Sequence, residues 1–261
     1  MGKITEALKK ATEERLERLD KITRIHDHEQ LVIKKIGSSR VDPRIIAYFD
    51  PKALITEQYK ILRTNVLSLN KGKPPKVIVI TSSIHSEGKT ITALNLAVAL
   101  AQSTKKPKVL LIDADLRRGR VARYLGVDQK VGLTEALMGK VSPSDVLFHI
   151  DIENLTFISS GSVATNPVEL LDSEAMKDFL ASMRTKFDYI LIDTPPTISV
   201  TDSGIIGSLA DGVLMVVQAG RTQRGIVQRA TELLEQTHSR IVGHVLTSIE
   251  YHLPEYIYRY L

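Results

Sequence analysis

The tripeptide Gly88-Lys89-Thr90 has the residue types and the order that proteins use to bind the phosphates of a nucleotide. It completes the pattern G-x-x-x-x-G-K-[ST], in which backbone N–H groups and the start of a helix bind the anion. In this pattern the lysine reaches the β- and γ-phosphates, and the hydroxyl after it is a ligand of Mg²⁺. Ser83 replaces the first glycine. The predicted phosphate-binding loop comprises Ser83, Ile84, His85, Ser86, Glu87, Gly88, Lys89 and Thr90.

Three aspartates stand at the ends of apolar runs further along the chain. Asp113 and Asp115 end the run VLLIDAD and share one face of an extended strand, and Asp193 ends the run YILID. Burying an unpaired carboxylate is costly, so a purely structural explanation requires ion pairs at both strand ends. Beside a phosphate-binding loop, a site for a metal ion and water explains them better. We therefore predict that the chain binds a nucleoside triphosphate and turns it over.

A parallel sheet is needed to bring these residues together. From residue 76 onward, short β-branched runs alternate with helix-like stretches such as TITALNLAVALAQS and SEAMKDFLASMRTKF. The expected strands are VIVITS, VLLIDAD, LTFISSG, YILIDTP, GVLMVVQ and IVGHVLTSI. Most of these runs are apolar on both faces, as buried parallel strands are. The alternation predicts an α/β fold with a mostly parallel sheet and helices on both of its faces.

The chain divides into three predicted parts. Residues 1–50 are expected to be a helical extension and linker, residues 51–250 the nucleotide-binding domain, and residues 251–261 a flexible tail rich in tyrosine. Apolar positions in residues 1–30 recur at roughly helical spacing. This helix either packs on its own domain or docks on another protein, and the sequence leaves both alternatives open. Residues 31–50 are predicted to be the linker, and a helix is expected after Pro51.

Composition excludes several classes of protein. The 261 residues are 43% hydrophobic and 25% charged, as in an ordinary globular protein. The absence of cysteine excludes disulfides and thiolate metal sites and suits a reducing cytoplasm. No apolar run approaches the roughly 18 residues that span a bilayer. The net charge of +5 is interleaved with acids, and there are five Phe and no Trp, so nucleic acid is not an expected partner.

Taken together, the motifs resemble those of the bacterial tyrosine kinases of polysaccharide synthesis and export, which have a P-loop NTPase-like fold. The similarity runs through SEGKT, LLIDADLRRGR and DYILIDTPP, and continues in EQYKILRTN, VGLTEALMGK and the tyrosine-rich end. The partitioning ATPases, which carry a signature lysine in the loop, fit less well because this chain has Ile84 there. The family's loop often reads Pro-Gly-Glu-Gly-Lys, where this chain has His85 and Ser86. Ser86 is expected to have an ordinary backbone conformation if it is not strained.

The resemblance implies autophosphorylation with ATP and Mg²⁺. It implies that Lys89, Asp113, Asp115 and Asp193 are catalytic, with Asp115 assisting deprotonation of the attacking hydroxyl. Thr90, Asp113 and Asp193 would organise the metal ion and its waters. The phosphate acceptors would be Tyr251, Tyr256, Tyr258 and Tyr260, four of the eight tyrosines in the chain. Considered without the family, the same tail fits a β-strand or an adhesive aromatic segment.

The family also implies partners. A membrane-embedded polysaccharide chain-length or export adaptor would activate a kinase that is cytoplasmic and peripheral to the inner membrane, and a phosphotyrosine phosphatase would oppose it. In the family an E-x-x-R-x-x-R helix mediates ring assembly, and this chain offers Glu57, Lys60 and Arg63 at the same spacing. A charged surface stripe is the alternative, since lysine lacks the planar fork of arginine.

Two further interpretations stay open at the level of sequence. Arg117, Arg118 and Arg120 could steer acidic groups, pair with acids of a neighbouring subunit, or form a solvated basic turn. The alternative to a kinase is an ATP-dependent molecular switch of the partitioning type, without kinase activity, whose two nucleotide states recruit partners.

Overall fold

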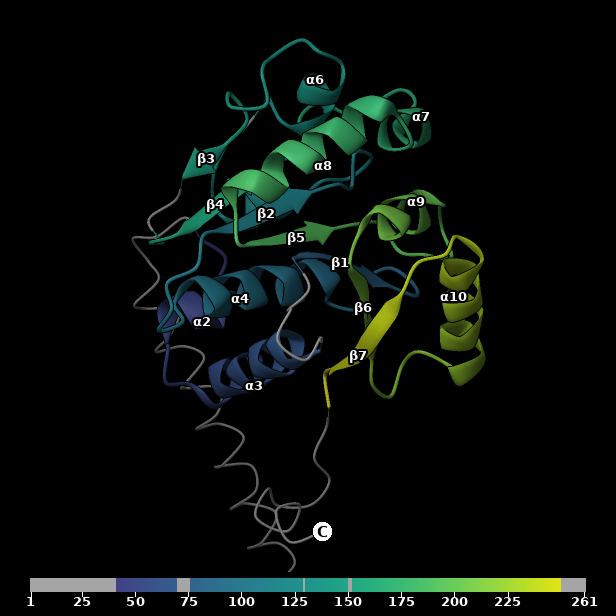
Figure 1. Ribbon diagram of the computed structural model, residues 1–261. Helices are drawn as coiled ribbons and strands as arrows, with labels where there is room; N and C mark the ends of the chain where they lie inside the picture. The colour runs from purple at the N-terminus through teal and green to yellow at the C-terminus, as the bar shows by residue number, and fades with distance from the viewer. Residues whose placement is uncertain (1–40, 70–75, 129, 150–151, 250–261) are drawn as a thin grey trace, which may run out of the picture.

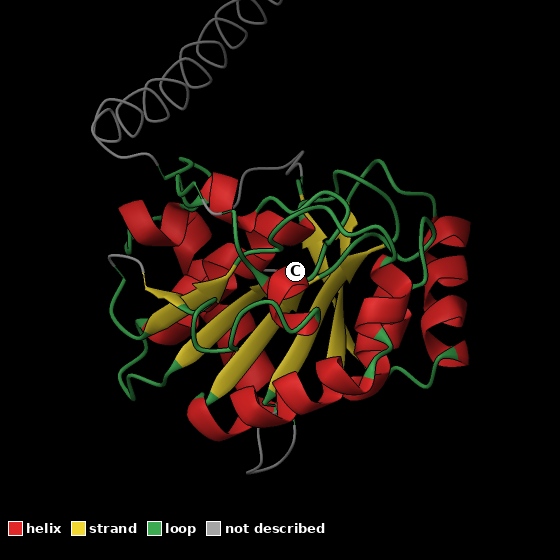
Figure 2. Cartoon of the chain, turned by 90° about the horizontal axis from the view of Figure 1, so that it is seen from above, coloured by secondary structure: helices red, strands yellow, loops and turns green. Residues whose placement is uncertain are grey.

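The computed structural model describes residues 41–69, 76–128, 130–149 and 152–249. The predicted helix over residues 1–30 and the tail over residues 251–261 lie outside these ranges and stay predictions. The described part forms a layered α/β structure, with helices on both sides of a central sheet (Figures 1 and 2). The predicted fold class is therefore confirmed.

The sheet has seven strands in the order β3-β4-β2-β5-β1-β6-β7. Every neighbouring pair is parallel except β3 and β4. Six strands correspond to the six predicted runs, whereas the two-residue antiparallel strand β3 has no periodic signal in the sequence. The strands are β1 (Val77–Ser82), β2 (Val109–Asp113), β3 (Phe148–His149), β4 (Leu155–Ile158), β5 (Tyr189–Asp193), β6 (Gly212–Gln218) and β7 (Ile241–Thr247).

Helices cover the two faces of the sheet in two separate groups, seen in Figure 1 on either side of β2 and β5. One group packs into a core with one face: α2 (Ile46–Phe49), α3 (Leu54–Ser68), α4 (Lys89–Ala101) and α5 (Val121–Tyr124). The other group packs on the opposite face: α6 (Leu133–Leu137), α7 (Pro167–Leu171), α8 (Glu174–Lys186), α9 (Asp202–Leu209) and α10 (Arg224–Gln236).

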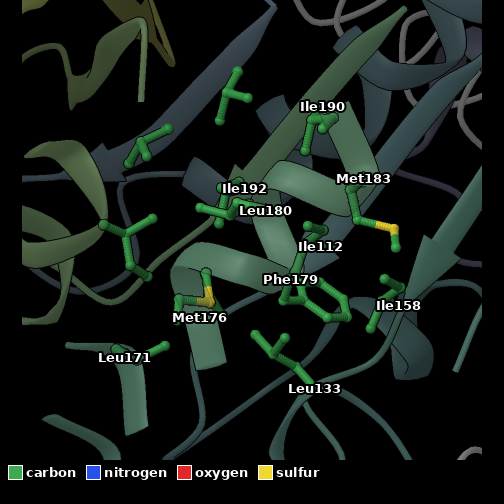
Figure 3. Packing of buried hydrophobic residues seen from close by; sticks show 14 of the residues in the cluster. Ile112, Leu133, Ile158, Leu171, Met176, Phe179, Leu180, Met183, Ile190 and Ile192 are labelled. Carbon is green, nitrogen blue, oxygen red and sulfur yellow. The ribbon is translucent and has the colours of Figure 1, made fainter. Parts of the chain in front are cut away.

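Two hydrophobic cores result, because successive side chains of a strand point to opposite faces. In β1, Val77 and Val79 belong to the core under α8, and Ile78 and Ile80 to the core under α4. Figure 3 shows the first core, where Phe179, Leu180 and Met183 of α8 lie over Ile112, Ile158, Ile190 and Ile192 of the strands. Burial on both faces explains why the runs are almost wholly apolar and fixes the strand ends that carry the site.

Residues 41–50 pack into the domain, although the sequence analysis assigned them to the linker. Ile45 and Ala47 are fully buried among the side chains under α4. Asn95 of α4 holds the segment: its Oδ1 accepts the N–H of Ala47 at 3.0 Å, and its Nδ2 donates to the carbonyl of Arg44 at 2.9 Å. Among the described residues, the domain therefore includes the segment 41–50.

Candidate functional site

The predicted catalytic residues meet at the carboxyl edge of the sheet. The phosphate-binding loop connects the end of β1 to α4, Asp113 ends β2, and Asp193 ends β5. Strand β5 lies between β1 and β2, and Asp113 and Asp193 are directly paired in register. The loop and both carboxylates thus come from three adjacent parallel strands, which is the place where open α/β sheets bind ligands.

The loop turns sharply before helix α4. Gly88 has a φ of +93°, a conformation that glycine adopts without cost, and α4 begins at the next residue, Lys89. Ser86 has a φ of +65°, so the ordinary conformation that the sequence analysis expected for an unstrained serine is not present. A serine therefore occupies a left-handed position, where the side chain adds strain to the backbone.

Glu87 organises the loop from inside. Its carboxylate is buried and accepts hydrogen bonds from the N–H of Ile84 at 2.8 Å, from the N–H of Gln218 at 3.2 Å and from the Thr222 hydroxyl. Its carbonyl accepts the Thr247 hydroxyl at 2.7 Å. The loop is thereby tied to β6, to the segment after β6 and to β7. Glu87 was predicted to bind the nucleotide, but its carboxylate makes hydrogen bonds within the protein that stabilise the loop.

Lys89 lies between two of the predicted catalytic acids. Its Nζ is 3.9 Å from Asp115 Oδ2 and 3.7 Å from Asp193 Oδ1. The Thr90 hydroxyl donates to Asp193 Oδ2 at 2.7 Å, while Asp193 Oδ1 is buried and has no hydrogen-bond partner. A buried carboxylate oxygen without a donor is costly unless a cation or a ligand completes it. Lys89, at 3.7 Å, is the cation that faces Asp193 Oδ1, and a bound metal ion would stabilise this charge further.

Asp113 is held rigidly behind this group. Its two oxygens accept the N–H of Asp115 at 3.1 Å and the N–H of Val121 at 2.9 Å. Burial, and then the nearby charge of Asp193, raise the pKa of Asp113 to about 7. Burial also raises the pKa of Asp193 against the opposing influence of Lys89. Burial thus disfavours the charged form of both aspartates, and a cation bound beside them would favour it.

These residues fit Mg²⁺. The ion prefers oxygen ligands and is commonly held by one or two carboxylates together with substrate phosphates and water. Thr90 and Asp193 supply such oxygens, and the open Oδ1 of Asp193 is the atom that a cation would complete. Within the described ranges no three His, Cys, Asp or Glu side chains converge as a metal-binding group. A protein-only metal cage is therefore not the arrangement; phosphate oxygens would complete the coordination.

A pocket of about 330 Å³ opens beside this group. It is lined by Arg44, His85, Ser86, Gly88, Lys89, Thr90, Ile91, Asp115, Arg118, Arg120 and Tyr124. Ser83 and Ile84, also predicted for the loop, do not line it; the Ser83 side chain is buried against Met215. His85 lies at the rim, with its Nε2 3.3 Å from the Ser199 hydroxyl.

This chain is similar in sequence and in structure to known proteins. The family model described as an AAA domain matches residues 75–242. Tyrosine-protein kinase YwqD of Bacillus subtilis (strain 168) is 37% identical over 216 residues, which cover 83% of this chain and 90% of the relative. The BceF tyrosine kinase domain has a TM-score of 0.72 and 35% identity, over 82% of this chain and 84% of that one. The kinase domain of the Escherichia coli tyrosine kinase ETK has a TM-score of 0.72 and 29% identity, over 80% and 83%.

This chain belongs to the bacterial tyrosine kinases. A P-loop ATPase-type kinase domain implies ATP binding, and Lys89 and Thr90, at the start of α4, are the residues predicted to contact the nucleotide. Membership of this family supports the kinase over the partitioning-type switch as the activity of the chain. In the described part of the kinase, no helix is long and apolar enough to cross a membrane.

Several residues that shape the kinase site escaped the sequence analysis. Asp202 is fully buried and binds Arg117 through both carboxylate oxygens, each at 3.2 Å. The pair joins the turn after β2 to α9 and withdraws Arg117 from the pocket. Arg44 and Tyr124 line the pocket, with the Arg44 guanidinium 5.0 Å from the centre of the Tyr124 ring. No motif marks these contacts, because their partners are distant in sequence.

The three residues predicted for assembly lie on α3, on the far side of α4 from the sheet. Lys60 Nζ donates to Glu57 at 2.7 Å and to the carbonyl of Pro51 at 2.7 Å. Arg63 donates to the carbonyl of Ala99 at 2.8 Å and so fastens α3 to α4. Glu57 and Lys60 are therefore a surface ion pair, whereas Arg63 has a structural contact within the chain.

Proposed function

We propose that this kinase transfers the γ-phosphate of ATP to tyrosines of its own tail, Tyr251, Tyr256, Tyr258 and Tyr260. The observation that carries the proposal is the position of Lys89, whose ammonium lies within 4.0 Å of both Asp115 and Asp193 at the start of α4. A cation between a phosphate loop and two carboxylates can bind the transferring group and leave one carboxylate free to take a proton. Four acceptor hydroxyls lie in the last eleven residues of the same chain.

In the proposed reaction, backbone N–H groups of the loop and the start of α4 bind the β- and γ-phosphates. The tyrosine oxygen forms a bond to the γ-phosphorus as the bond from that phosphorus to the β–γ bridging oxygen breaks, and ADP leaves. The phenolic proton moves to the Asp115 carboxylate, which Lys89 and the N–H of Arg118 hold in place. Lys89 stabilises the charge that spreads over the transferring group. When bound, Mg²⁺ would neutralise phosphate charge beside Thr90, Asp113 and Asp193.

The biological role is a proposal that rests on the family. Regulation of exopolysaccharide or capsule synthesis or export would follow from phosphorylation of the tail, since each phosphate adds about −1.5 to −2 charge and makes neighbouring tails repel. A membrane-embedded adaptor would recruit and activate the kinase at the cytoplasmic side of the membrane, and a phosphatase would reset it. Assembly into a ring would use α3, where the Glu57–Lys60 ion pair lies at the surface.

The decisive experiment separates the enzyme from its substrate. A chain lacking residues 251–261 is mixed with a full-length Lys89→Met chain in the presence of MgATP, and the phosphates are located by mass spectrometry. We expect the truncated chain to bind MgATP and to phosphorylate the tail of the inactive chain, because a tail needs only to encounter a neighbour's site. Each chain alone should give background signal. Phosphate found mainly on Tyr48 or Tyr59, or loss of MgATP binding on truncation, would contradict the proposal.

A further inference from the structure

The mouth of the kinase pocket carries two arginines that the nucleotide loop does not account for. Arg44 is already committed, because its Nε and Nη2 bind the two oxygens of Asp42 at 2.9 and 2.8 Å. In contrast, Arg118 and Arg120 line the same pocket with exposed side chains. Within the ranges that the structure describes, neither of these two guanidinium groups has an ion-pair or hydrogen-bond partner. Both are therefore available to an anionic group that enters from outside.

The two arginines follow the strand that ends at Asp113 and lie close to Asp115 in the chain. They stand in the turn between β2 and α5, whereas the phosphate-binding loop follows β1, and β5 separates the two strands. The backbone N–H of Arg118 donates to Asp115 Oδ1 at 2.9 Å, so this turn also positions the proposed proton acceptor. A tyrosine whose hydroxyl reaches Asp115 would leave its neighbouring residue at the mouth, beside Arg118 and Arg120.

The tail offers two chemically different kinds of tyrosine. Glu250 directly precedes Tyr251 and Glu255 directly precedes Tyr256, whereas Arg259 stands between Tyr258 and Tyr260. A carboxylate next to the acceptor would be attracted to the two arginines, and an arginine next to it would be repelled. The charge pattern of the tail and that of the mouth are complementary for only two of the four tyrosines.

We propose that Arg118 and Arg120 select the acceptor by binding a glutamate adjacent to the tyrosine. Tyr251 and Tyr256 are then phosphorylated faster than Tyr258 and Tyr260, and acidic tyrosine segments are the substrate class of this pocket. The proposal rests on the tail being the substrate, and it adds to that function an order among the tyrosines and the residues that set it.

The test uses acceptors with a single tail tyrosine. Each acceptor is a full-length Lys89→Met chain in which three tail tyrosines are changed to phenylalanine, leaving either Tyr256 or Tyr258. The enzyme is the full chain with all four tail tyrosines changed to phenylalanine. We expect transfer to Tyr256 to be about fivefold faster at low salt, the size of effect that an exposed ion pair can give. Glu255→Gln in the acceptor should remove the advantage, and high salt should reduce it.

The second arm changes the enzyme. Arg118→Gln together with Arg120→Gln should abolish the preference for Tyr256 and make transfer insensitive to Glu255→Gln, as two partners of one interaction do in a double-mutant cycle. Arg123→Gln is the matched control, because Arg123 is an exposed arginine of α5 that lines a different pocket. The control should keep the preference. Exchanging the charges, with Arg120→Glu in the enzyme and Glu255→Arg in the acceptor, should restore part of it.

The outcomes separate this proposal from the one on which it rests. Equal rates on the two acceptors, or a preference that survives in the Arg118→Gln, Arg120→Gln enzyme, overturn acceptor selection and leave the tail kinase intact. A higher KM for ATP with the same loss on both acceptors assigns the arginines to the nucleotide and also overturns it. Transfer to neither acceptor by the enzyme with intact arginines overturns the proposed function itself.

Discussion

Two buried carboxylates at the same edge of the sheet have opposite surroundings. Glu135 of α6 accepts the N–H of Gly132 at 2.8 Å, and both the N–H of Ser162, at 3.2 Å, and the Ser162 hydroxyl. Asp193 accepts one hydrogen bond, from Thr90, and leaves Oδ1 without a donor. Glu135 is saturated by donors from the start of α6 and from the loop that follows β4, whereas Asp193 Oδ1 faces only the Lys89 ammonium, at 3.7 Å.

The pKa values follow this difference. Burial alone would raise the pKa of Glu135, but the Ser162 hydroxyl and the backbone N–H groups outweigh burial and lower the pKa below its ordinary value of 4.5. At Asp193, burial prevails over Lys89 and the Thr90 hydroxyl, and the pKa is raised. Hydrogen-bond donors hold the saturated acid in its charged form, whereas burial disfavours the charge of the unsaturated acid, which a bound cation would stabilise. Glu87 belongs to the first kind, although it lies within the phosphate-binding loop.

Removing the charge of the unsaturated acid should have the largest effect. In Asp193→Asn the remaining oxygen can still accept the Thr90 hydroxyl, so we expect the melting temperature of the nucleotide-free protein to be unchanged or higher. Phosphoryl transfer should fall by about 100-fold or more, as for other groups that stabilise transition-state charge. Phosphotyrosine formation and thermal melting are measured together. Asp178→Asn, an exposed acid on α8, is the control; transfer at the wild-type rate in Asp193→Asn would remove Asp193 from the site.

Removing the charge of the saturated acid should instead cost stability. In Glu135→Gln the side-chain amide would face a backbone N–H that now donates to Glu135, leaving a buried donor unpaired at about 1–3 kcal/mol of unfolding free energy. The lowered pKa of Glu135 means that its contribution is present above pH 4.5 and is lost as the pH falls through the folded-state pKa. The gap between wild type and Glu135→Gln, measured by denaturant unfolding, should therefore be widest near neutral pH and close in acid.

A matched surface variant sharpens this second test. Glu174 forms an exposed ion pair with Lys177 on α8, and such pairs contribute little to stability. Glu174→Gln should unfold almost as the wild type does at every pH. An equal loss in both variants, or a gap that widens in acid, would show that Glu135 is not stabilised in the way its hydrogen bonds indicate.

The saturated and unsaturated acids also show what sequence can and cannot predict. That Lys89, Asp113 and Asp193 lie at one edge followed from the predicted parallel sheet, because parallel strands present their carboxyl ends at the same edge. That β5 lies between β1 and β2 came from the structure. The hydrogen bonds of the Glu87 side chain could not be predicted, because Gln218 and Thr222 lie more than a hundred residues away in the chain, in β6 and just after it. The Arg117–Asp202 pair escaped for the same reason. Local pattern specifies elements and their ends; non-local hydrogen bonds decide which acid is structural.

The residues predicted for assembly also differ in whether their contacts are structural or at the surface. Arg63 bonds to the carbonyl of Ala99, whereas Glu57 and Lys60 bond mainly to each other at the surface. We expect Glu57→Ala with Lys60→Ala to lower the mass of an oligomeric wild type in light scattering with little change in melting temperature. Arg63→Ala should lower both, because it leaves a buried carbonyl contact unmade. An unchanged mass distribution in the double variant would reject this part of α3 as the interface.

The smallest expected effect concerns backbone strain in the phosphate-binding loop. Ser86 has a φ of +65°, where a side chain costs free energy and glycine does not. In Ser86→Gly the relief of strain exceeds the extra freedom of the unfolded chain, so we expect a gain of about 0.5 kcal/mol in stability. Ala181→Gly, at an exposed position in the middle of α8, is the control and should lose about 1 kcal/mol, since glycine weakens a helix interior. Because the carbonyl of Ser86 accepts Arg221 at 3.1 Å, and a backbone acceptor survives the substitution, the loop should keep its shape and the kinase its activity. A loss of stability in Ser86→Gly would mean that the serine side chain, and not the backbone alone, holds the loop in its left-handed turn.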